Sequence, residues 1–418
     1  MATHGRFLTL KLFVLEPVLA TFILIPMDRD QLNHLQAYGA VYQMLDKGYT
    51  AEVLLNFRGG SFLLEESEAL QELLHRYGIS WERFGEEDLY RFEKQREKEN
   101  LERLKLEKAP RIAIYKPPGT DPWDDAVQLV LDFAQIRYDT LYDEEVLRGE
   151  LSRYDWLHLH HEDFTGQYGK FYGFARNQEW YQERRLESEE LARKLGFSRV
   201  PELKKEVALA IQDYVSKGGF LFAMCSATDS LDIALAAQNI DIVDPLLDHT
   251  PVTDGYQKKL DFNKTLAFYE FQVITDPFIY EFSDIDINPQ EEGIAQSKDF
   301  FTLFEFNAKT DPIPTLLTQN HVRQIRGFLG QTTAFRLSKI KPRVLILGQT
   351  LGSERVKYIY GSYGRGFFSF YGGHDPEDYQ HLVGDPPTDL RLYKNSPGYR
   401  LILNNIFMPA AQPKKQKT

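Results

Sequence analysis

Cys225 is the only cysteine in the chain, and it lies where a buried strand is expected to give way to a helix. Residues 220–224, FLFAM, are apolar throughout, as in a strand covered on both faces. Ser226, Thr228 and Asp229 then supply side chains that favour a helix start. A thiol at a helix N-terminus has its thiolate stabilised by the helix dipole, so Cys225 is a candidate nucleophile. The alternative is a small buried apolar side chain, a common role for a free cysteine.

His374 is the candidate base for that thiol. In FFSFYGGHDPEDYQH a predicted strand runs into Gly372 and Gly373, which allow a sharp turn just before His374. The cysteine and the histidine would then both follow the carboxyl ends of strands, where α/β sheets bind their ligands. A nucleophile needs such a base within hydrogen-bond reach. A surface histidine in a polar turn is the alternative.

A second group of histidines occurs in HLHHED, residues 158–163. On a strand, His158 and His160 share one face and His161 points to the other. These imidazoles and the acidic residues after them could line a pocket or bind a metal ion. They lack a fixed ligand spacing such as HExxH, and we predict neither a metal site nor another cofactor. Gly166, shortly afterwards, is a candidate donor of a backbone N–H to an oxyanion.

Alternating strands and helices are needed to position these residues, and the sequence supplies them in two blocks. In the first block, residues 22–28 and 51–57 are predicted strands on either side of a helix over 31–48, which gives a βαβ unit. A helix over 65–77, a strand at 79–84 and a charged helix over 86–110 are expected to follow. We place a domain boundary near residue 108, which makes residues 21–108 an N-terminal βα domain.

The second block repeats the alternation over residues 109–410 and predicts a doubly wound, flavodoxin-like parallel sheet. Its predicted elements are strands in RIAIY, YDTLY, DWLHLHH, FLFAM, PRVLILG, VKYIYG and FFSFY, and helices over 121–135 (capped by Asp121), 144–151, 201–219, 229–238 and around GYRLILNNIF. Residues 250–310 depart from this pattern. Their short aromatic strands, LAFYEFQVI and FFTLFEF, indicate an inserted antiparallel β region.

The composition narrows the classes of function. Acidic residues outnumber basic ones 61 to 49, so no overall field attracts nucleic acid. One cysteine excludes an internal disulfide and a cysteine-clustered zinc site. Residues 1–20 fit either a leader or a cleaved signal peptide, so localisation stays open between cytoplasm and cell envelope. No membrane span is predicted, the tail from 411 is expected to be disordered, and the expected partner is a small molecule.

The run GGFLFAMCSA and the late FYGGHDPE resemble the nucleophile turn and the histidine strand of the class I glutamine amidotransferase-like superfamily, particularly its ThuA-like branch. The resemblance covers roughly residues 109–248 and 310–408. It implies that Cys225 attacks a carboxamide or related carbonyl, with His374 as base and Glu377 as the acid that orients it. The chain departs from the amidotransferase pattern in having Met224 and Ser226 beside the cysteine, and His-Asp-Pro-Glu in place of His-Pro-Glu.

Four stretches spread over nearly the whole chain read ILIPMDRDQLNHLQAYGAVY, NFRGGSF, HHEDFTGQYGKFYGF and YGGHDPEDYQHLVGDPPTDLRLYKNSPGYRLILNN. They resemble a bacterial family, common in Bacteroidota, whose members are often labelled asparagine synthetase B. The residues argue against that activity. A class II asparagine synthetase would expose a cysteine after Met1, but residue 2 is Ala. It would also carry a glycine-containing loop that binds pyrophosphate, whereas the nearest string, SATDS, contains no glycine.

Three hypotheses follow. The first is a cysteine-dependent hydrolase or amidotransferase-like enzyme that acts on an amide or related acyl substrate. The second is a non-catalytic protein that binds a small ligand or carbohydrate in a cleft lined by His160, His161, Trp123, Tyr371 and His374. The third is a metal-dependent hydrolase built on HLHHED. The residues expected to contact the substrate are His160, His161, Glu162, Gly166, Ser226, Gly373 and Asp375.

Overall fold

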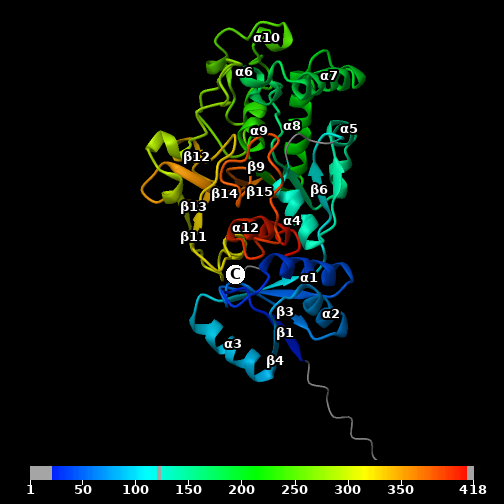
Figure 1. Ribbon diagram of the computed structural model, residues 1–418, viewed down its shortest axis with the longest axis vertical. Helices are drawn as coiled ribbons and strands as arrows, with labels where there is room; N and C mark the ends of the chain where they lie inside the picture. Colours follow the sequence, from blue (N-terminus) through cyan, green and yellow to red (C-terminus); the bar gives the residue numbers. More distant parts are fainter. Residues whose placement is uncertain (1–20, 120–123, 412–418) are drawn as a thin grey trace, which may run out of the picture.

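The computed structural model describes residues 21–119 and 124–411. The predicted leader, Asp121, Trp123 and the tail beyond 411 lie outside the described residues. The chain forms a smaller N-terminal unit, drawn in blue, and a larger α/β unit (Figure 1). Within the described ranges, no helix combines the length and the apolar run needed to cross a bilayer.

The N-terminal unit contains an antiparallel sheet in the order β4-β1-β3-β2-β5. Its strands are β1 (Phe22–Ile25), β2 (Ala51–Leu55), β3 (Ser61–Glu65), β4 (Glu82–Phe84) and β5 (Glu102–Leu106), and its helices are α1 (His34–Asp46), α2 (Glu68–Tyr77) and α3 (Glu86–Lys98). Both β1 and β2 run antiparallel to β3, which lies between them. The predicted βαβ unit is therefore split by a strand that the sequence pattern did not predict.

The charged segment predicted as one helix over 86–110 contains a helix and a strand. Helix α3 ends at Lys98, and β5 then pairs with β2. In β5 the side chains of Glu102, Leu104 and Leu106 are buried in alternation with more exposed neighbours. This period of two indicates a strand, but the surrounding charged residues masked it. The prediction of a single helix was wrong.

The larger unit is built on a mixed sheet of ten strands. Its members are β6 (Ile112–Tyr115), β7 (Asp139–Leu141), β8 (Trp156–Leu159), β9 (Phe220–Met224), β10 (Phe300–Leu303), β11 (Gln324–Arg326), β12 (Phe335–Arg336), β13 (Leu345–Gln349), β14 (Arg355–Tyr363) and β15 (Gly366–Tyr371). The order is β11-β10-β13-β14-β15-β9-β8-β6-β7, and β12 pairs with β14. Neighbours from β15 to β7 are parallel, and the remaining pairs are antiparallel. The predicted α/β class is therefore confirmed, as a sheet that is both parallel and antiparallel.

Helices cover both faces of the parallel strands. The helices of this unit are α4 (Ala126–Ala134), α5 (Asp143–Leu147), α6 (Tyr172–Ala175), α7 (Glu179–Lys194), α8 (Val200–Ser216), α9 (Ala227–Ala236), α10 (Pro245–Asp248), α11 (Pro312–Leu317) and α12 (Pro397–Ile406). On β9, Phe222 packs in one core with residues of α4 and α12, whereas Leu221 packs in a second core with residues of α8 and α9. This two-sided burial explains why FLFAM is apolar throughout.

Two local predictions differ from the structure. Helix α4 begins at Ala126 with Asp125 as its cap, so the predicted cap Asp121 was wrong. Of the two aromatic strands predicted in the 250–310 insert, FFTL forms β10 in the main sheet. The other makes isolated bridges only, through Phe268 and Val273.

The two units share one hydrophobic core. Helix α1 of the N-terminal unit contacts α4 and α12 (Figure 1). At the contact with α4, a Cβ placed on Gly39 would lie 1.9 Å from the carbonyl oxygen of Ala134. Only glycine therefore lets these helices approach so closely.

Candidate functional site

Cys225 occupies a strained turn between β9 and α9. Strand β9 ends at Met224, and Cys225 has a φ of 49°, a left-handed conformation that is uncommon for a residue with a side chain. Its backbone N–H donates to Gly373 O at 3.2 Å, and its carbonyl accepts from the Thr228 hydroxyl at 2.7 Å. Such strain persists only where neighbours hold it, and it is common at functional sites. The thiol is thus fixed at the carboxyl end of a central strand.

Four segments that are distant in sequence meet around this turn. Besides the Cys225–Gly373 bond, Ala227 N donates to His160 O at 3.0 Å, Gly373 N to Thr332 O at 2.7 Å, and His374 N to Leu329 O at 2.9 Å. The segments after β8, β9 and β15 are therefore joined to the loop 328–334 by backbone hydrogen bonds. This assembles the site from long-range contacts.

A pocket of about 160 Å³ opens beside Cys225. It is lined by His161, Phe171, Cys225, Tyr280, Gly330, Gln331, His374, Gln380, His381, Leu382 and Val383. The predicted nucleophile and base therefore line the same pocket, although no hydrogen bond joins the thiol to the imidazole. A larger cavity of about 880 Å³ lies near the starts of β8 and β9, beside Asp155 and Phe220, and contains none of the candidate residues.

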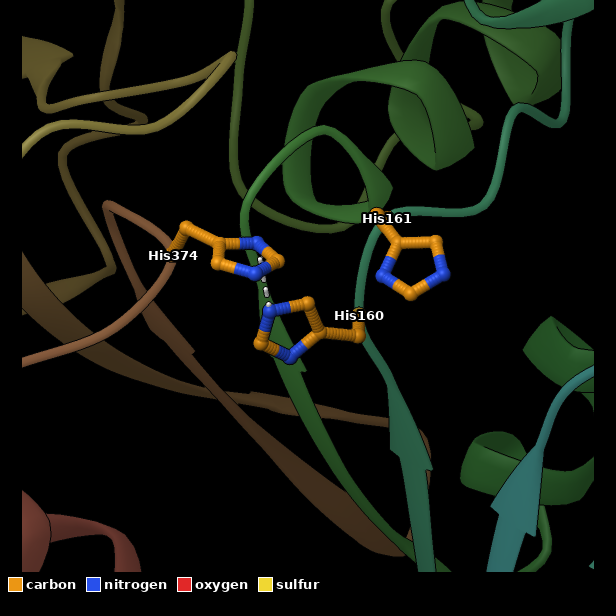
Figure 2. A group of neighbouring side chains, drawn as sticks. All are labelled: His160, His161 and His374. Carbon is orange, nitrogen blue, oxygen red and sulfur yellow. Dashed lines mark hydrogen bonds between the residues drawn. The ribbon is translucent and has the colours of Figure 1, made fainter. Parts of the chain in front are cut away.

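His374 is oriented by a second histidine. Its Nδ1 lies 3.0 Å from His160 Nε2, drawn as the dashed line in Figure 2. His160 Nδ1 lies 3.4 Å from Asp125 Oδ1, and the same carboxylate caps α4 through the N–H groups of Val127 and Gln128. If His160 donates to Asp125, its Nε2 accepts from His374 Nδ1, so His374 Nε2 carries a lone pair. This buried Nε2 has no hydrogen-bond partner among the described residues.

His381 stacks on His374 and carries the positive charge of the pair. The two ring centroids lie 4.6 Å apart. Burial alone would lower the pKa of His381, but its contacts with Asp124 (2.8 Å) and Asp378 (3.0 Å) raise it to about 9. Burial, together with the neighbouring His160 and His381, lowers the pKa of His374 well below its ordinary value. At neutral pH, His374 is therefore uncharged and able to accept a proton.

Backbone amides face the Cys225 thiol. Burial raises the pKa of Cys225 to about 11, while the backbone N–H groups of Gln331, Ser226 and Thr332 oppose that rise. These donors stabilise negative charge on the sulfur atom or on an oxygen close to it. Because the pKa of the Cys225 thiol is raised, the thiol is protonated at neutral pH and would act as a nucleophile only if a base removed its proton.

The loop 328–334 that supplies two of these amides is held in place by buried ionisable residues. Lys357 Nζ donates to Phe328 O and, at 2.7 Å, to Thr333 O. Asp286 accepts from Thr333 N at 2.7 Å, and Asp229 accepts from the Thr332 hydroxyl at 2.9 Å. These contacts tie both ends of the loop to the sheet and to α9. Lys357 and the two aspartates therefore position the amides, and none of the three lines the Cys225 pocket.

Burial gives Lys357 a predictable effect on stability. Desolvation lowers the pKa of Lys357 from 10.5 to about 7. Between these values the unfolded chain binds one proton more than the folded chain, so the free energy of unfolding should rise with pH. The expected increment is a few kcal/mol, since each pH unit between the two pKa values contributes about 1.4 kcal/mol. Urea unfolding of wild type and of Lys357→Met from pH 6 to 10 measures this rise in the free energy of unfolding, which should be present in wild type and absent from the variant. Parallel profiles for the two proteins would contradict the prediction.

The acid predicted to orient His374 is replaced by another residue. Glu377 is partly buried and has a raised pKa because of desolvation, with Ser396 as its hydrogen-bonding neighbour. No hydrogen bond or ion pair joins it to His374 within the described chain. The carboxylate that His374 reaches, through His160, is that of Asp125. Asp375, predicted to contact substrate, accepts hydrogen bonds from Glu377 N, Thr388 and Tyr399, so it holds its own loop together.

The other residues predicted to contact the substrate are divided between the Cys225 pocket, the turn at Cys225 and a second pocket. His161 lines the Cys225 pocket, and Gly373 bonds directly to the cysteine backbone. Ser226 contributes its backbone N–H, whereas its hydroxyl has no hydrogen-bond partner in the described part of the chain. Glu162 and Gly166 line a separate small pocket of about 70 Å³, which His161 also borders. Gly166, predicted to donate an N–H to an oxyanion, does not line the Cys225 pocket.

Two further predictions concern the walls of the cleft. Tyr371 is fully buried among Phe301, Phe328 and Tyr358, so it does not line the pocket. Trp123 lies outside the described residues. Tyr280 and Phe171 supply the aromatic lining instead.

Sequence reasoning missed four residues that matter at this site: Asp125, Gln331, Lys357 and His381. A carboxylate that caps a helix, such as Asp125, can also be read as purely structural. Lys357 lies in a strand that is otherwise largely apolar, where a charged residue is itself a signal. His381 follows His374 by seven residues, but no spacing rule relates them. Gln331 reaches the site only through the fold of its loop.

Comparisons with known proteins give distant likenesses. No family model matches the chain, and no curated protein matches it. Among solved structures, the Cytoplasmic Protein STM3548 from Salmonella typhimurium is similar at 10% identity and a TM-score of 0.34, over 72% of this chain and 100% of that one. The Cytoplasmic Protein STM1381 from Salmonella typhimurium LT2 is similar at 11% identity and a TM-score of 0.35, over 72% of this chain and 100% of that one. Gan42B, a GH42 beta-galactosidase from G. stearothermophilus, is similar at 11% identity and a TM-score of 0.29, over 74% of this chain and 31% of that one. Likenesses at these TM-scores carry no functional argument.

Proposed function

We propose that the protein is a cysteine-dependent hydrolase or amidotransferase-like enzyme that acts on an amide or related acyl substrate. The observation that carries the proposal is the Cys225 turn. A strained cysteine at the end of a central strand faces three backbone N–H groups and shares a pocket with a neutral histidine. This arrangement supplies a nucleophile, donors for developing negative charge and a base.

The reaction would proceed in two halves. His374 Nε2 takes the thiol proton of Cys225, and the sulfur attacks the carbonyl carbon of the substrate. The oxygen that becomes negative is stabilised by the N–H groups of Ser226, Gln331 and Thr332. The carbon–nitrogen bond then breaks, His374 returns the proton to the leaving amine, and a thioester forms on Cys225. Water, deprotonated by His374, hydrolyses that thioester and regenerates the thiol.

The fold supports a relationship at the level of architecture. We propose that the parallel strands β7, β6, β8, β9 and β15, with helices on both faces, correspond to the doubly wound sheet of the class I glutamine amidotransferase-like superfamily and its ThuA-like branch. Cysteine after β9 and histidine after β15 match the order of the motifs in that superfamily. Asparagine synthesis driven by ATP is not part of the proposal, because SATDS, the nearest string to a pyrophosphate-binding loop, contains no glycine.

Trapping of an acyl-enzyme tests the proposal. Purified protein would be incubated with a panel of primary amides, acylated amines and activated esters, and its intact mass would be followed over time. We expect a transient mass increase located on Cys225, and loss of turnover after stoichiometric alkylation of that thiol by iodoacetamide. Turnover that survives complete alkylation would rule out a thiol nucleophile.

A second candidate is a non-catalytic protein that binds a small polar ligand or a carbohydrate. Two observations favour it: the pKa of Cys225 is raised, and the thiol makes no hydrogen bond to His374. Phe171 and Tyr280 give the pocket an aromatic wall that suits a sugar ring. Saturable binding of a sugar that leaves every member of the panel intact would favour this candidate.

A further inference from the structure

The side chains of His160, His161 and His374 form a cluster of buried imidazoles (Figure 2). His161 and His374 also line the pocket beside Cys225. One ligand atom from each lies within 4.8 Å of the others, and His160 Nε2 is 3.0 Å from His374 Nδ1. Two nitrogens bound to one tetrahedral zinc ion lie about 3.3 Å apart, given zinc–nitrogen bonds of about 2.05 Å. To bind zinc, the rings of His160 and His374 would have to separate slightly, and the ring of His161 would have to move closer to them. We propose that these three histidines bind a zinc ion and leave its fourth position open toward the Cys225 pocket.

Carboxylates occupy the places that orient ligating histidines. Asp125 Oδ1 lies 3.4 Å from His160 Nδ1, and Glu162 Oε1 lies 3.9 Å from His161 Nε2. A carboxylate on the far nitrogen of a histidine fixes the ring and raises its basicity toward the metal. His374 Nε2 is buried and has no hydrogen-bond partner within the described ranges, and Asp124 lies close enough to share a ligand group with it. Binding through Nδ1 would place the proton of His374 on this Nε2.

Two neighbouring groups of metal-ligating residues fit a metal ion less well. In the group Asp124, His374 and His381, both nitrogens of His381 already face carboxylates, Asp378 at 3.0 Å and Asp124 at 2.8 Å. In the group Asp125, His158 and His160, His158 has one nitrogen on Phe222 O and the other on His160. The His160–His374 pair has the shorter separation, 3.0 Å against 3.3 Å for His158 and His160, and it borders the Cys225 pocket through His374.

Zinc and thiol chemistry would compete for the same nitrogens. The metal takes the lone pair of His160 Nε2 and that of His374 Nδ1, so the proton of His374 moves to Nε2 and the base is lost. Zinc is therefore expected to inhibit turnover. This inhibition rests on the proposed function, whereas the binding itself does not.

Direct titration with the metal tests the site. Metal-free full-length protein would be titrated with Zn²⁺ by calorimetry and with Co²⁺ by visible absorption, which reports the coordination of the ion. We expect one saturable site per chain, a Zn²⁺-dependent rise in the melting temperature, and a Kd raised at least about 100-fold by His160→Gln or His161→Gln. Circular dichroism and thermal unfolding would show that the variants are folded.

Matched variants separate this proposal from its neighbours. His381→Gln removes a histidine from the same pocket and should leave the Kd within about threefold. Cys225→Ala should also leave it unchanged, so metal binding can succeed or fail independently of thiol chemistry. The proposal is overturned if wild type shows no saturable site, or if binding depends on His381 or Cys225 and not on His161.

Discussion

Replacement of Cys225 by alanine is expected to lower kcat/KM by at least about a thousandfold, because removal of a covalent nucleophile leaves only binding and charge stabilisation. The side chain is small and its neighbours reach it through backbone groups, so the fold should persist. The φ of 49° is the one source of strain, and alanine carries the same Cβ as cysteine. Turnover of the best substrate from the amide and ester panel, with the melting temperature as a check on folding, measures the effect.

Substrate affinity distinguishes the two candidate functions in the same variant. An enzyme that uses Cys225 covalently should lose turnover in Cys225→Ala but retain its Kd for substrate within severalfold, because the pocket walls remain. A Cys225→Ser variant should also be strongly impaired, since a hydroxyl is a much weaker nucleophile than a thiolate at the same pH. Turnover within tenfold of wild type in Cys225→Ala would show that the cysteine is a structural residue.

The position of Cys225 was accessible from sequence because it depends on local signals. A wholly apolar run of five residues predicts a strand buried on both faces, and residues with helix-capping side chains predict the start of a helix after it. The structure places β9 and α9 there. The two glycines before His374 likewise marked the end of β15. These signals act within a few residues, so one sequence is enough to reveal them.

The orienting partner of His374 was not accessible in the same way. Glu377 was predicted from the resemblance to the His-Pro-Glu pattern of the amidotransferases, but the loop held by Asp375 leaves it without a contact to His374 among the described residues. Asp125 lies some 250 residues away along the chain, and it reaches the site only because α4 begins beside the carboxyl end of β8. Contacts of this kind depend on sheet order. The order of the large sheet was not predicted, and its strands from β14 to β11 are antiparallel where the sequence pattern predicted a parallel sheet.

Replacement of His374 by glutamine is expected to lower kcat/KM by about a hundred- to ten-thousandfold, the range typical of a general base. Glutamine can keep a hydrogen bond to His160, but it cannot take the proton of a thiol whose pKa is about 11. The rate of alkylation by iodoacetamide should fall as well, because the base also generates thiolate. Replacement of the orienting residue, Asp125→Asn, should lower kcat/KM by a smaller factor of about ten, and it should also lower the rate of alkylation.

Glu377→Gln supplies the matched control for the same experiment. His374→Gln and Glu377→Gln both place glutamine in the segment after β15, but only His374 borders the Cys225 pocket. If Asp125 and His160 orient the base, Glu377→Gln should retain kcat/KM within about threefold of wild type while Asp125→Asn does not. The reverse pattern would restore Glu377 as the third member of the triad and would mean that the His160–His374 contact is rearranged during turnover. Because neither substitution touches the thiol, the comparison isolates how the proton is held at His374.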